Sequence, residues 1–296
     1  MKKIIMVMVS LVIMGFLFVA CEKERVETNV NKELVSAEDV FAHLKLYNNN
    51  LVVNNCNSNR GFFSSLGNIC MIAGADIIGA GTGIWACKEI LAYYSVATGG
   101  AGGLIAGAAV GLVCGAGASY AVTRNVIDMP NLNEVDWREI PFFLDKRYDV
   151  FNQIGYGHNT YLKQVKYGRI TEVDWIKENY REYSDDLIML FSTNEIVNLR
   201  STIISLSNKY KEDNYDYSLF LQSLHDERLL STNIHKTLAL FMEGYVMSES
   251  YDDIANICDF YTKQILDSNF SELEKQALVT SFSVATKSPL FWNKLN

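Results

Sequence analysis

Residues 90–123 contain no charged side chain, and this stretch limits the possible folds of the chain more than any other. It is 34 residues long, whereas about 20 apolar residues are enough for a helix to span a bilayer. A glycine inside a helix costs about 1 kcal/mol relative to alanine. A helix that keeps several of them must therefore gain something from the missing side chains. Within this stretch glycine recurs at every fourth position: Gly99, Gly103, Gly107, Gly111 and Gly115.

A four-residue spacing places these glycines on one face of a helix. A face without side chains lets another backbone come close, which recovers energy through dispersion and weak Cα–H···O contacts. The apolar segment before it has a similar spacing, at Ala75, Gly79, Gly83 and Cys87. The "TGGAGG" cluster at 98–103 predicts a turn. Residues 62–124 are therefore predicted to form a glycine-zipper hairpin with helical arms at about 65–97 and 103–123.

Two environments suit such a hairpin. It resembles the glycine-zipper membrane hairpins of some outer-membrane lipoproteins and the Gly/Ala-rich helices of small pore-forming bacteriocins. This resemblance implies membrane insertion or self-association of copies through the GxxxG face, and we expect this environment. The alternative is a buried hairpin inside a water-soluble helical domain, covered by the C-terminal helices. Asp76, Lys88 and Glu89 favour that alternative, because ionisable groups at bilayer depth are expensive.

Residues 1–20 have the pattern of a secretory signal peptide, with a basic start and an almost unbroken apolar run. The segment "FVAC" at 18–21 resembles the lipobox of bacterial lipoproteins. The resemblance implies cleavage before Cys21, whose thiol and new amino group would carry acyl chains such as palmitate and bind membrane lipid. Because Glu22 follows the cysteine, it also implies the outer membrane, with the periplasmic or surface face left open. An uncleaved signal-anchor helix is the alternative. Residues 21–61 are predicted to be a tether followed by a short helix.

The charge and the motif content exclude several classes of function. The chain has 26 basic and 34 acidic residues and a net charge of −8 without a basic stripe, so nucleic acid is not expected as a partner. None of the four histidines lies at a metal-ligand spacing, and no nucleophile elbow or Walker loop is present. The "GAGTG" segment at 79–83 lacks the third glycine of a dinucleotide-binding loop. We expect no metal, no cofactor and no enzyme activity.

Five cysteines follow Cys21, and an exported chain lies in an oxidising compartment where disulfides persist. Cys87 and Cys114 are equally distant from the predicted turn, so a symmetrical hairpin would place them level with each other. We therefore predict that they form a disulfide, provided that their Cα atoms lie within about 7 Å.

Residues 131–296 are predicted to form an acidic domain of six or seven helices, which makes the whole chain all-α. Apolar residues there have helical spacing, and no alternating strand pattern of useful length competes. Capping-box patterns begin several of the predicted helices. Including one before the hairpin, the pairs are Ser36 with Asp39, Thr171 with Asp174, Ser192 with Glu195, Ser250 with Asp253, and Ser271 with Glu274.

The segments "IGYGHNTYL" (154–162) and "SVATKSPLFW" (283–292) resemble an uncharacterised family of exported helical proteins. That family has a Gly…His-Asn…Leu signature and a C-terminal Ala…Ser…aromatic-Trp ending, and the resemblance implies no activity. This chain departs from the pattern at Gly157 and Pro289. We expect the histidine and asparagine to cap a helix end or to bond across the bundle rather than to bind a ligand. The matching positions are Gly155, His158, Asn159, Leu162, Ser288 and Trp292.

Together these features predict a lipid-anchored envelope protein without enzyme activity, which associates with a membrane or binds an unidentified protein partner. One alternative is a bacteriocin-like toxin whose hairpins assemble into a pore. Another is an enzyme that uses His158 in an interhelical pocket. The enzyme would require His158 to be exposed in a concave site beside another titratable group.

Overall fold

Residues 36–296 form one compact unit. Regular structure in the described part of this unit consists of twelve α-helices and short helical turns, without a β-strand, which confirms the predicted all-α fold. The leader and Cys21 lie outside the described residues. The computed structural model describes residues 34–55, 63–97, 101–123, 151, 153–168, 170–248 and 250–292.

The predicted hairpin lies at the centre of this unit. Helix α3 (Phe63–Ala86) packs antiparallel against α5 (Ala101–Thr123), and α4 (Lys88–Ala97) continues the first arm and packs on the beginning of α5. The first arm is therefore two helices, separated at Cys87, instead of the single helix that the sequence predicted. The hairpin and the C-terminal helices share one compact unit, so the boundary expected between them does not separate two bodies.

The two glycine faces pack on each other within this one hairpin. A Cβ atom added to Gly79 would lie 2.9 Å from Ala118 Cβ, and one added to Gly83 would lie 2.7 Å from Cys114 Cβ. A Cβ atom added to Gly115 would lie 2.7 Å from the backbone carbonyl oxygen of Asp76. Residues with side chains would force α3 and α5 apart, so glycine spacing is what permits this contact.

The remaining glycines of the second arm have different surroundings. A Cβ atom on Gly103 would overlap Ser95 of α4, and one on Gly111 would lie 3.0 Å from both Ile84 and Thr280. A Cβ atom on Gly107, in contrast, would meet only the Leu91 side chain, at 3.5 Å. Gly107 therefore belongs to the sequence pattern but not to the close contact. Gly99 lies outside the described residues.

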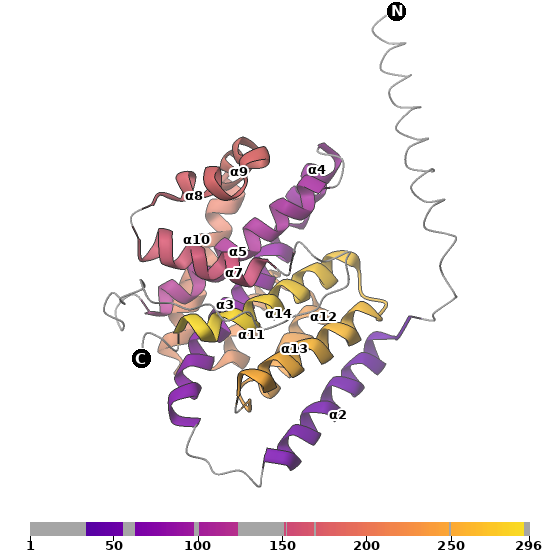
Figure 1. Cartoon of the computed structure of the whole chain (residues 1–296). Coiled ribbons are helices and arrows are strands. Elements are labelled where there is room, and N and C mark those ends of the chain that lie inside the picture. The colour runs from indigo at the N-terminus through magenta and orange to yellow at the C-terminus, as the bar shows by residue number, and fades with distance from the viewer. Residues whose placement is uncertain are drawn as a thin grey trace, which may run out of the picture. The chain divides into compact units, whose positions relative to one another are not determined.

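C-terminal helices cover the hairpin (Figure 1). Helix α14 (Glu272–Trp292) packs along α3, while α7 (Ile154–Tyr161) and α10 (Asn194–Glu212) pack against α5. In the described residues, one stretch is long and apolar enough to cross a membrane, Gly102–Thr123, and 89% of it is buried inside the protein. The hairpin thus has the second of the two environments considered, an apolar core covered by protein.

The outer helices complete the unit. Helix α2 (Ala37–Asn55) packs against α12 (Thr232–Tyr245) and α13 (Tyr251–Leu266), and α11 (Tyr217–Asp226) lies between α10 and α12. The described part after residue 150 has eight α-helices rather than six or seven. The additional helix arises because a 3-10 turn (Arg181–Tyr183) separates two short helices, α8 (Glu172–Asn179) and α9 (Ser184–Phe191).

Helix starts follow the predicted capping boxes closely. The hydroxyls of Ser36, Thr171, Ser250 and Ser271 each accept a hydrogen bond from the backbone N–H three residues later. At the beginning of α10 the cap is Thr193, which accepts from Ile196 N–H, instead of the predicted Ser192. Local sequence therefore determines the helix starts to within one residue.

Candidate functional site

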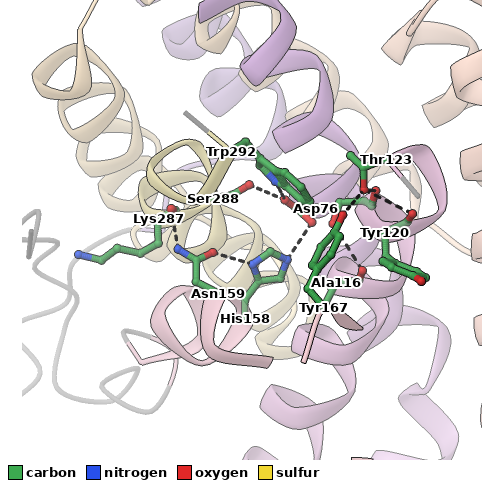
Figure 2. Close-up of polar contacts among 11 residues, drawn as sticks. Asp76, Ala116, Tyr120, Thr123, His158, Asn159, Tyr167, Lys287, Ser288 and Trp292 are labelled. Atoms are coloured by element: carbon green, nitrogen blue, oxygen red, sulfur yellow. Dashed lines mark hydrogen bonds and ion pairs between the residues drawn. The ribbon is translucent and has the colours of Figure 1, made fainter. Parts of the chain in front are cut away.

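The carboxylate of Asp76 lies at the centre of a polar cluster inside the protein. Asp76 is in the middle of α3 and is fully buried. Its Oδ1 accepts a hydrogen bond from His158 Nε2 at 2.8 Å, and its Oδ2 accepts from Trp292 Nε1 at 2.6 Å and from the Ser288 hydroxyl. Donors from two other helices, α7 and α14, thus converge on one carboxylate of α3 (Figure 2).

Asn159 holds the His158 ring on the side away from Asp76. The Asn159 amide Nδ2 donates to the carbonyl oxygen of Lys287 at 2.8 Å, so its Oδ1 faces the ring and lies 3.0 Å from Nδ1. The other ring nitrogen lies 2.8 Å from Asp76 Oδ1. Both ring nitrogens of His158 are therefore engaged by buried oxygen atoms of the protein.

Helix α7 comes close to α14 because residue 155 is a glycine. A Cβ atom on Gly155 would overlap the Ser283 carbonyl oxygen and would lie 2.8 Å from Lys287 Cγ. The backbone N–H of Gly155 donates to Ser283 Oγ at 3.1 Å. His158 is three residues later on the same side of α7, so a larger residue at 155 would move it away from Asp76. The Gly…His-Asn spacing therefore has a packing reason.

Pro289 lies inside α14 without ending the helix. Proline has no backbone N–H, so the Ala285 carbonyl, four residues earlier, loses its intrahelical donor. The Tyr245 hydroxyl donates to that carbonyl in a long hydrogen bond of 3.5 Å. The helix then continues to Trp292, whose indole N–H donates to the Asp76 carboxylate. The departure from the family pattern at Pro289 is thus accommodated by a neighbouring helix.

Tyr167 lies beside the cluster, on the side of α5. Its hydroxyl makes a 2.7 Å hydrogen bond with that of Thr123, and its ring meets the Trp292 ring edge-on with centroids 6.3 Å apart. Burial raises the pKa of Tyr167 to about 12. Tyr167 directly follows a π-helical turn (η3, Leu162–Lys166), and its backbone N–H donates to the Leu162 carbonyl. Leu162 itself is buried and contributes packing only.

The cluster is closed to solvent, and this limits its chemistry. The side chains of His158, Asn159, Ser288 and Trp292 are at most 1% exposed, and both ring nitrogens of His158 already have partners. His158 therefore does not meet the condition for an enzyme site, which was exposure in a concave pocket. A buried polar group that loses its hydrogen-bond partner costs about 1–3 kcal/mol of stability, and more if it is charged. The arrangement is suited to holding α3, α7 and α14 in one relative position.

A second polar group surrounds Glu172 nearer to the surface. Arg200 donates to both carboxylate oxygens, at 2.9 and 2.8 Å, and the Tyr161 hydroxyl also donates to this carboxylate. Burial alone would raise the pKa of Glu172, but the Arg200 guanidinium holds it below its usual value. The Lys166 ammonium lies 5.6 and 5.7 Å from the ring centroids of Tyr120 and Tyr161, and burial lowers its pKa. The sequence analysis did not identify this group.

The predicted disulfide between Cys87 and Cys114 is absent, and both are free, buried thiols in the structure. The register of the hairpin explains this error. Gly83, not Cys87, lies opposite Cys114, so Cys87 is about one helical turn farther along the first arm. Burial raises the pKa of the Cys114 thiol to about 12, and it raises that of Cys87 even further.

Asp76 is the residue that the sequence analysis did not include in the site. A signal for it existed, because it is the single charged residue between positions 62 and 87. A carboxylate inside an apolar helix needs hydrogen-bond partners, and its three partners, His158, Ser288 and Trp292, were all among the matched positions. In the described residues no group of three His, Cys, Asp or Glu side chains is arranged to hold a metal ion.

Comparison of the chain with protein-family models, with curated proteins and with solved structures found no match.

Proposed function

We propose that the chain is a lipid-anchored envelope protein whose helical body, residues 36–292, is a non-enzymatic binding domain held at a membrane surface. The observation that supports this most directly is the burial of α5, since 89% of Gly102–Thr123 is covered by other parts of the protein. Helix α5, covered in this way, is not available to lipid. Attachment to the membrane is then the role of acyl chains at Cys21, in the sequence that resembles a lipobox.

The glycine contacts favour this function over a pore. Gly79, Gly83 and Gly115 are in close contact inside one hairpin, so self-association of copies through the same faces would require α3 and α5 to separate. The net charge of −8 favours a protein partner with a basic surface.

Carbonate extraction of membranes tests the proposal. The native chain is compared with a Cys21→Ala variant that carries an ordinary cleavable signal in place of the first twenty residues. We expect the native chain in the membrane pellet, with acyl chains on its N-terminal peptide by mass spectrometry. We expect the variant in the soluble fraction with a helical circular dichroism spectrum.

Two results would contradict the proposal. A variant that stays in the pellet without aggregating would show that the body itself is inserted in the bilayer. An unmodified Cys21 in the native chain would show that the lipid anchor is absent. Dye release from liposomes separates the pore alternative. If the chain releases dye and a Gly107→Leu change abolishes the release, the hairpin builds a pore and the binding-domain proposal is wrong.

A further inference from the structure

Helix α4 carries an exposed apolar face near the turn of the hairpin. Tyr93 is 73% exposed and Val96 is 83% exposed, the highest values among the large hydrophobic side chains of the described residues. Ala92 is also exposed. On the other side of α4, Leu91 and Ser95 pack against α5. We call Ala92, Tyr93 and Val96 the α4 tip.

The α4 tip lies in the uncharged part of the chain. Charged residues make up 20% of the sequence, but none occurs from 90 to 123. Lys88 and Glu89, at the beginning of α4, are the nearest ones on the hairpin itself. The Tyr94 hydroxyl donates to the Asp186 carbonyl of α9, so an acidic helix start lies near the middle of α4. In the described residues, the charges near α4 therefore lie toward its beginning and middle, whereas Val96 is in its last turn.

The point where the N-terminal segment joins the body lies toward the same end. Helix α14 runs antiparallel to α3, because Gly81 lies against Ala277 whereas Asp76 bonds to Ser288. The first residues of α14 are therefore near the end of α3 from which α4 continues. Phe270, just before α14, packs on Phe41 near the beginning of α2, with ring centroids 6.0 Å apart.

From these observations we infer that the α4 tip contacts the lipid bilayer in which Cys21 is anchored. This inference rests on the proposed lipid anchor. Fourteen residues lie between Cys21 and Ser36, and this stretch spans at most about 50 Å when extended. The tether keeps the tip at a high effective concentration near lipid, so a weak contact is sufficient.

The composition and size of the α4 tip fit lipid better than a second copy of the chain. Tyrosine is enriched at membrane–water interfaces, where its ring and hydroxyl are both satisfied. A stable protein interface buries about 800 Å² on each partner, whereas one aromatic side chain contributes about 150–250 Å². Tyr93 and Val96 alone do not reach the area that a dimer needs.

Tryptophan fluorescence in proteoliposomes tests the inference. The full acylated chain is reconstituted in vesicles of phosphatidylethanolamine and phosphatidylglycerol with brominated acyl chains, which quench tryptophan on contact. A Tyr93→Trp variant reports on the tip, and the quenching of the native chain is subtracted. Leu219→Trp is the matched control, since Leu219 is 52% exposed on α11. Its neighbour Phe220 stacks on Tyr210, whose hydroxyl donates to the Met71 carbonyl oxygen in the first half of α3. Leu219 is therefore on a part of the body away from α4, which follows the other end of α3.

We expect at least twofold stronger quenching for Tyr93→Trp than for Leu219→Trp, and loss of that excess when Val96→Asp is added. Equal quenching of the two variants would overturn the inference. So would a change in the emission of Tyr93→Trp that depends on protein concentration without lipid, because that result indicates a second copy.

A Cys21→Ala version of the Tyr93→Trp chain separates failure of the tip from failure of the anchor. If the tip binds lipid, this unanchored chain is still quenched, but it needs roughly 100-fold more lipid. If the acylated chain pellets with vesicles and its tip is not quenched, only the inference about the tip is wrong. If the native chain is not acylated, the proposed function is wrong whatever the tip does.

Discussion

Replacing two glycines of α5 by alanine should have opposite effects on stability. Both positions belong to the same four-residue repeat, and both gain about 1 kcal/mol of helix propensity from the change. At Gly107 the new Cβ atom lies 3.5 Å from Leu91 Cδ1, an ordinary contact, so the gain is retained. At Gly115 it lies 2.7 Å from the backbone carbonyl oxygen of Asp76, which cannot rotate away. Overpacking against a backbone atom that cannot move lies in the upper part of the usual range, at about 2–3 kcal/mol, so it outweighs the gain in helix propensity.

We therefore expect Gly107→Ala to raise the free energy of unfolding by about 1 kcal/mol and Gly115→Ala to lower it by about 1–2 kcal/mol. The melting temperatures should differ by about 4–12 °C, since 1 kcal/mol shifts a protein of this size by about 2–4 °C. Urea unfolding followed by circular dichroism measures both, with an unchanged m value as the control. If both variants shift stability in the same direction, α3 and α5 do not pack through their glycine faces.

Three further predictions concern buried polar groups. Asp76→Asn should lower the free energy of unfolding by about 1–3 kcal/mol or more because an amide nitrogen replaces one acceptor oxygen and leaves a buried donor without a partner, whereas Asp185→Asn at an exposed helix start should change it by less than about 1 kcal/mol. Equal urea midpoints for the two variants would contradict this. Cys114, with a pKa raised by burial to about 12, should not react with Ellman's reagent at pH 8 until the protein unfolds, and fast labelling of the folded chain would refute its burial. Burial raises the pKa of Tyr167 from 10.0 to about 12, so its contribution to stability is complete below pH 10 and is lost as the pH rises toward 12. The difference in urea midpoint between the native chain and Tyr167→Phe should therefore shrink between pH 10 and pH 12. A constant difference would show that the ionisation of Tyr167 is not linked to folding.

The repeat of glycines in α5 predicted close helix packing, and the structure confirms it. The sequence did not determine what covers the hairpin, because lipid tails and buried protein side chains offer an apolar helix nearly the same environment. The C-terminal helices decide this point by covering α5. Asp76 favoured protein over lipid as the surroundings of the hairpin, since a carboxylate is far easier to satisfy inside a protein that supplies donors than inside a bilayer.

The Cys87–Cys114 prediction failed for a geometric reason. It assumed a symmetrical hairpin with one straight first arm, whereas the chain breaks at Cys87 and the arms pair with Gly83 opposite Cys114. A shift of one turn moves a side chain by about 5.4 Å along the helix. Register of this kind depends on how both arms fit together and is not encoded by the distance of each cysteine from the turn.

The sequence by itself determined the all-helical fold, the N-terminal caps of four helices and the spacing of the glycines. These features depend on residues within about four positions of one another, where a single segment carries all the information. Only the tertiary structure decided that His158, Ser288 and Trp292 share Asp76 as their partner, across 82, 212 and 216 positions of sequence. A buried carboxylate requires donors from somewhere, but which helices supply them depends on how the whole body packs.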